Sequence, residues 1–108
     1  MRQGNVFYKG EKAGLLSQFN DGHFEFQYED NWLNNTSYPA ISLTLPKTEE
    51  RHMSDYLFPF FYHLLPEGIN KQIICKHLRI DENDYFGLLL NIAGNDTIGA
   101  VTVQKLEA

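Results

Sequence analysis

The sequence predicts an α+β fold in which about five strands form a curled antiparallel sheet, a partial barrel, with about three helices beside it. Apolar and polar residues alternate in the first half of the chain, as they do on half-buried strands. In the second half the apolar residues recur at helical spacing. Strand and helix patterns are thus segregated, which favours α+β. The length of 108 residues predicts a single domain over residues 1–108.

Four strands are expected in the first half, at residues 6–9, 13–19, 23–28 and 41–45. The clearest signal is at residues 23–28, where aromatic and polar residues alternate strictly. Asp21 and Gly22 precede this strand and predict a hairpin turn, because such a pair tolerates positive φ angles. Residues 41–45 alternate in the same way. Residues 47–53 are polar, so we expect a loop there.

The second half predicts three helices, over residues 59–65, residues 69–79 and a segment ending near residue 92, and then a strand over residues 98–103. Pro59 suits the first position of its helix, where no backbone N–H is needed. Asp81 or Asn83 is expected to cap the third helix, and Gly94 to supply the left-handed residue after it. The final strand is apolar on both faces, so we expect it to be well covered.

The charge and cysteine content argue against several classes of protein. Nine basic and fourteen acidic residues give a net charge of −5, whereas nucleic-acid binding usually needs a basic stripe. The densest basic group, around Lys76 and Arg79, adjoins Asp81 and Glu82, so we interpret it as a solvated helix end. The chain has one cysteine, and no apolar run has the length of a signal peptide or membrane span. We expect a cytoplasmic protein that binds neither nucleic acid directly nor a membrane.

No catalytic, metal or cofactor site is expected. The four histidines, at positions 23, 52, 63 and 77, lack metal-ligand spacing, and one cysteine cannot build a zinc site. Cys75 is expected to be a small buried or half-buried helix residue rather than a nucleophile. The sequence contains no glycine-rich phosphate-binding motif. Adjacent carboxylates such as Glu49 and Glu50 are not arranged as an acid and a base, so we predict that the chain is not an enzyme.

Residues 57–65 are apolar on almost every side of a helix, although a surface helix needs only one apolar stripe. Two explanations stay open. Either the helix lies centrally and is covered all round, or one stripe is buried while another docks on a partner. In the second case Leu57, Phe61 and Leu64 face inward. The predicted partner-binding residues are Phe58, Phe60, Tyr62, His63 and Glu67.

Four blocks of sequence carry a family resemblance. They are Ser42-Leu43-Thr44-Leu45-Pro46, then Phe60-Phe61 through Leu64-Leu65-Pro66-Glu67-Gly68, then Asp84 with Phe86 and Leu89-Leu90, and finally Gly94-x-Asp96-x-x-Gly99-Ala100-Val101. In this order they resemble the N-terminal subdomain of HipA-type serine/threonine kinase toxins, over about residues 5–103. Tyr62 and His63 depart from the family, in which more polar residues are common, and they add apolar surface to the stretch already singled out.

The resemblance implies a function that composition and spacing do not. The nucleotide site and catalytic residues of HipA-type toxins belong to a kinase core that follows this subdomain. The chain is similar to the HipS proteins of three-gene HipBST systems, so we expect a cofactor-free antitoxin that binds and neutralises a HipT-type serine/threonine kinase. A HipB-type helix-turn-helix repressor is expected as a further partner in a ternary complex.

Two alternatives to this function remain open. The chain is either a bridging subunit that joins kinase and repressor without inhibition, or the truncated N-terminal subdomain of a full HipA kinase. Two mechanisms of inhibition also stay open. An aromatic side chain can enter or distort the nucleotide region of the kinase, or the domain can hold the kinase lobes open.

Overall fold

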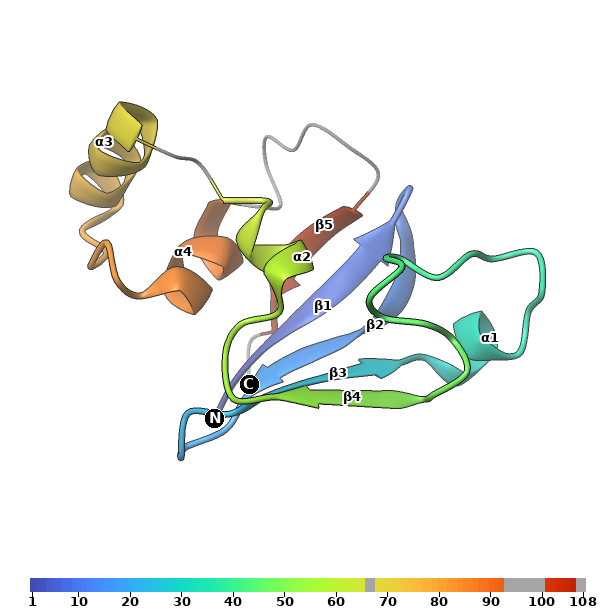
Figure 1. Cartoon of the computed structure of the whole chain (residues 1–108). Helices are drawn as coiled ribbons and strands as arrows, with labels where there is room; N and C mark the ends of the chain where they lie inside the picture. The colour runs from blue at the N-terminus through green and yellow to red at the C-terminus, as the bar shows by residue number, and fades with distance from the viewer. Residues whose placement is uncertain (66–67, 93–100, 107–108) are drawn as a thin grey trace.

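The computed structural model describes residues 1–65, 68–92 and 101–106 (Figure 1). Its elements are, in order, β1 (Arg2–Tyr8), β2 (Glu11–Gln18), β3 (Phe24–Tyr28), α1 (Asp30–Leu33), β4 (Arg51–Ser54), α2 (Pro59–Tyr62), α3 (Gly68–Leu78), α4 (Tyr85–Ile92) and β5 (Val101–Lys105). The strands pair antiparallel in the order β4-β3-β2-β1-β5. The predicted α+β class with a curled five-stranded sheet is therefore confirmed, and the described sheet does not close into a barrel.

The hydrophobic core lies between one face of the sheet and the helices (Figure 1). Alternate strand residues such as Val6, Phe26 and Val103 are fully buried on this face. Gly4 permits a close approach of α4 to the sheet, because a Cβ there would lie 2.6 Å from Cδ2 of Leu90. The largest fully buried side chains come from both layers: Trp32, Tyr28, Phe26, Phe61, Phe86, Leu16, Leu45, Leu88 and Leu89.

The fourth strand was predicted at the wrong place. Residues 41–45 form turns rather than a strand, and the strand beside β3 is β4, which begins within the segment expected to be a loop and extends one residue beyond it. The alternation at 41–45 has another cause: Ile41 and Leu45 are buried, whereas Leu43 between them is fully exposed. The Tyr28 hydroxyl holds this segment, because it donates to the Leu45 carbonyl and accepts the Ile41 N–H at 3.2 Å.

One of the two predicted helix starts is confirmed and the other is wrong. Pro59 is the first residue of α2, as predicted, although α2 is shorter than expected and continues as turns through Leu65. The cap of α4 is neither Asp81 nor Asn83 but Asp84, whose Oδ1 accepts the Gly87 N–H at 3.1 Å. Asp81 instead accepts the Asn83 N–H at 2.8 Å, within the turn that precedes α4.

The remaining elements complete the comparison. A fourth short helix, α1, for which no element was predicted, follows β3, and its Trp32 is buried and donates its indole N–H to the Pro39 carbonyl at 2.9 Å. The final strand is present as β5, whereas Gly94 and residues 98–100 lie outside the described residues. In the described part of the chain, no helix combines the length and apolar character that a membrane crossing requires.

Candidate functional site

Helix α2 separates the aromatic stretch into a buried and an exposed side. Phe61 is fully buried and Leu65 nearly so, whereas Tyr62 is 41% exposed. Phe58 was expected on the exposed side, but it is only 7% exposed. Pro59 begins the helix, so Phe58 keeps an extended backbone just before it, and its ring packs 6.2 Å from the ring of Phe61. The monomer therefore does not offer Phe58 to a partner.

The exposed ring of Tyr62 belongs to a small cluster drawn from three helices. The rings of Tyr62 and Tyr85 meet edge to face, with centroids 5.2 Å apart and planes at 87°. The Lys71 Nζ lies 4.9 Å from the Tyr85 ring centroid, over that ring. His63 adjoins Tyr62 with ring centroids 6.1 Å apart. We call Tyr62, His63, Lys71 and Tyr85 the tyrosine cluster.

Helix α4 and its packing against the core fix the position of the tyrosine cluster. Tyr85 is the first residue of α4, and the next turn of that helix buries Leu88 and Leu89 completely. The preceding residue, Asp84, caps the helix and accepts two hydrogen bonds from Arg2, at 2.9 and 2.8 Å. The Arg2 side chain thereby lowers the pKa of the Asp84 carboxyl. The start of α4 is thus tied to β1, which fixes the position of Tyr85.

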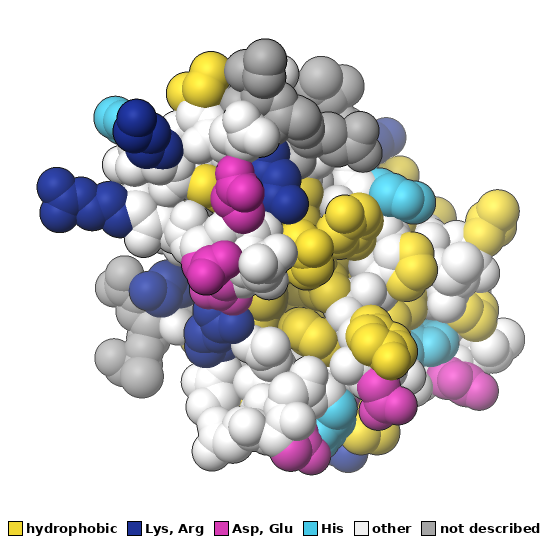
Figure 2. All heavy atoms as spheres, turned by 60° about the vertical axis from the view of Figure 1, so that its left-hand side comes forward, with side chains coloured by type: hydrophobic (Ala, Val, Ile, Leu, Met, Phe, Trp, Pro, Cys, Tyr) yellow, Lys and Arg dark blue, Asp and Glu magenta, His cyan; other side chains and the backbone are white. Residues whose placement is uncertain are grey.

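The tyrosine cluster has the chemistry of a docking surface. Tyrosine rings bury a large area at low conformational cost and keep a hydroxyl for hydrogen bonding. Lys71 adds one cation, and no described carboxylate lies within ion-pair distance of it. Figure 2 shows hydrophobic side chains gathered at the centre and right of this side of the molecule, with lysine, arginine and acidic side chains at the left. The result is an apolar patch bordered by charges of both signs.

The predicted partner-binding residues have different positions in the structure. Tyr62 and His63 are exposed as expected, and Phe60 is half-buried, 5.2 Å from the Phe61 ring. Glu67 lies outside the described residues. Lys71 and Tyr85 were not predicted. The sequence carries no signal for Tyr85, because the buried Leu88 and Leu89 lie three and four residues further on and share its side of the helix.

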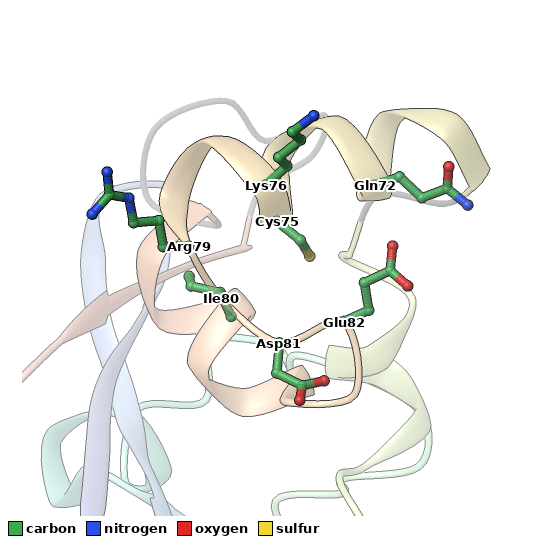
Figure 3. Close-up of a pocket in the computed structure, with 7 residues that line it drawn as sticks. All are labelled: Gln72, Cys75, Lys76, Arg79, Ile80, Asp81 and Glu82. Atoms are coloured by element: carbon green, nitrogen blue, oxygen red, sulfur yellow. The ribbon is translucent and has the colours of Figure 1, made fainter.

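A shallow depression beside α3 offers a second place for a site (Figure 3). Cys75 is buried, as expected, and points into the depression, while Lys76 points away from it. Asp81 and Glu82 border it, but no described group of three or more His, Cys, Asp or Glu side chains is placed to hold a metal ion. The depression is lined by both basic and acidic side chains, and the described ones are not arranged as a catalytic acid and base. The tyrosine cluster therefore remains the candidate site.

Comparisons with known proteins agree with this reading of the fold. The family described as the HipA N-terminal domain matches residues 4–104. A solved structure described as the N-terminal domain of HipA toxin superimposes with a TM-score of 0.74 at 38% identity, covering 99% of this chain and 94% of that chain. An uncharacterised protein of Haemophilus influenzae is 42% identical over 107 residues, which are 97% of this chain and 93% of the relative.

Two longer relatives come from Sinorhizobium fredii. "Putative kinase Y4mE" is 31% identical over 97 residues, which are 90% of this chain but 23% of the relative. "Putative kinase Y4dM" is 31% identical over 104 residues, which are 91% of this chain but 25% of the relative. The chain thus spans about a quarter of the length of these two relatives. With the family match covering nearly all of its residues, the chain belongs to the HipA N-terminal domain family.

Proposed function

We propose that this chain is the antitoxin subunit of a HipBST-type system and neutralises a HipT-type serine/threonine kinase in the cytoplasm by docking the tyrosine cluster on it. The observation that carries the proposal is the occurrence of the same domain in two contexts. It forms about a quarter of two relatives named as putative kinases, and nearly the whole of a small Haemophilus influenzae protein. A domain that is fused in one protein and separate in another replaces a covalent tether by a binding surface.

The exposed aromatic residues supply that surface. As a separate subunit, the domain would bind the kinase with a measurable affinity, and interface affinity is concentrated in a few aromatic or arginine side chains. Tyr62 and His63 are exposed, Phe60 and Tyr85 are half-buried beside them, and all are held by elements packed into the core. We therefore place Phe60, Tyr62 and His63 in the interface and leave Phe58 in the core. In this role the chain needs no cofactor and catalyses no reaction.

Co-expression with a HipT-type kinase tests the proposal. We expect the chain to restore growth to cells that express the kinase and to co-purify with it. Tyr62→Ala should weaken kinase binding by more than about tenfold with the fold intact, because a central interface tyrosine is truncated. The matched control is Tyr56→Ala, since Tyr56 is 80% exposed and lies outside the tyrosine cluster. Equal affinities of the two variants would exclude Tyr62 from the interface.

The longer relatives favour one second candidate, in which the domain is a working part of a HipA-type kinase. The match to a quarter of each S. fredii protein is the observation behind it. Kinase activity measured with and without this chain separates the two functions. Inhibition on addition supports the antitoxin, whereas unchanged or restored phosphorylation supports a structural or integral role.

A further inference from the structure

We infer that Lys71 is a specificity-determining residue and that the partner surface receiving Tyr62 carries an Asp or Glu carboxylate at the rim of its apolar pocket. The inference rests on the proposed function and adds the chemistry of the partner. The observation behind it is the Tyr62–Tyr85–Lys71 contact series, in which three separate helices place one cation a single ring away from the exposed tyrosine.

Lys71 lies close enough to Tyr62 for one partner to cover both residues. A protein interface of standard size buries about 800 Å² on each partner, which corresponds to a disc about 30 Å across. The centroid of the Tyr85 ring lies 5.2 Å from the centroid of the Tyr62 ring and 4.9 Å from the Lys71 Nζ. A partner centred on Tyr62 therefore also covers Lys71.

The charge of Lys71 is not fully satisfied by its contact with the Tyr85 ring. The face of a tyrosine ring attracts an ammonium group, but it satisfies none of the three N–H donors in the way an oxygen does. No described carboxylate of this chain lies within ion-pair distance of Lys71. Covering a charged ammonium group costs several kcal/mol of desolvation, and an anion that pairs with it offsets part of this cost. We therefore expect the partner that covers Lys71 to supply the anion.

The ammonium group of Lys71 is held in one place by its surroundings. Lys71 is half-buried, and its ammonium group lies over a ring that the capped start of α4 holds in place. A positioned cation loses less conformational freedom on binding than a free lysine side chain. Lys76, on the same helix, lies over no described aromatic ring and is exposed, pointing away from the α3 depression (Figure 3). Lys71 and Lys76 therefore have the same charge but different expected effects on binding.

Binding kinetics with the purified chain and the HipT-type kinase of the co-expression experiment test the inference. We expect Lys71→Met to weaken binding about fivefold at low salt, mostly through slower association, because it removes one complementary charge. The salt dependence of the affinity between about 50 and 500 mM should flatten in this variant. Lys71→Arg should restore both properties, since it keeps the cation and its stacking on the ring. Lys76→Met, with the same change in net charge, should behave as the original chain.

The possible outcomes separate the inference from the proposed function. Should Lys71→Met and Lys76→Met bind with the same affinity and salt dependence, the carboxylate on the partner is refuted while the docking function stands. Should the unaltered chain fail to bind the kinase, the proposed function is refuted, and the inference with it. Thermal unfolding of every variant reports whether the fold is kept, and Lys71→Gln provides a second neutral variant in case methionine disturbs the packing.

Discussion

Gly87→Ala should destabilise the protein although helix propensity predicts the opposite. Near the start of α4, replacing glycine by alanine should gain about 0.5–1 kcal/mol, because alanine loses less backbone freedom on folding. At this position, however, a Cβ would lie 2.2 Å from Oδ2 of Asp84 and 2.8 Å from its Cγ. The carboxylate must therefore move away from the bonds that it makes.

The size of the loss follows from those bonds. Asp84 accepts the Gly87 N–H as the cap of α4, which is worth about 1 kcal/mol. It also accepts two hydrogen bonds from Arg2, but the side chains are 43% and 37% exposed, so solvent screening limits this pair to about 0.5–1 kcal/mol. Together these losses exceed the gain in propensity, and we expect a net loss of about 0.5–1.5 kcal/mol.

Urea unfolding of the original chain, Gly87→Ala, Asp84→Ala and the double variant measures the effect. In the Asp84→Ala background the obstacle is absent, so Gly87→Ala should stabilise the protein by about 0.5–1 kcal/mol. The sign of one substitution thus depends on the residue at position 84. Equal stabilisation in both backgrounds would refute the reasoning, because it would show that the carboxylate moves aside without cost.

Two other predictions concern stability. The Tyr28 hydroxyl satisfies the Ile41 N–H and the Leu45 carbonyl, so Tyr28→Phe should cost about 1–3 kcal/mol in urea unfolding, and an unchanged midpoint would contradict this. The pKa of Asp84 is lowered from its usual 3.8, chiefly by the Arg2 hydrogen bond. Its stabilising contribution is therefore complete above the unfolded pKa and is lost as pH falls through the lower folded pKa. Lowering the pH from about 5 to 2 should destabilise the original chain more than the Asp84→Asn variant. Parallel curves of unfolding free energy against pH for the two proteins would exclude this role.

The sequence predicted the elements whose signals are local. The alternation in β3 and the Asp-Gly turn before it depend on residues within a few positions of each other, and both are present. Strand β4 depends on a distant partner, because its polar His52 and Ser54 are placed by pairing with β3. Residues 41–45 show the converse, since their alternation records contacts with Tyr28 rather than strand pairing. Period-two patterns therefore identify buried positions here more reliably than they identify strands.

The candidate site could be predicted only in part, for the same physical reason. Tyr62 and His63 were found because the aromatic stretch exceeds what one buried stripe can hold. Lys71 and Tyr85 were missed because each is ordinary within its own helix. Their importance comes from tertiary contacts, which bring the starts of α3 and α4 to the end of α2. No spacing within the sequence records that meeting.

Tyr62 is exposed because of the way its helix packs into the core. Phe58 and Phe61 are three residues apart, Leu65 lies four further on, and all three are buried on one side of the α2 segment. Tyr62 follows Phe61 directly, so a helical backbone turns it about 100° away from that buried line. A side chain at this position reaches the surface for as long as Phe61 stays in the core. The fold thus presents a ring to solvent at a fixed place, and Tyr85 and Lys71 determine which kind of surface can cover it.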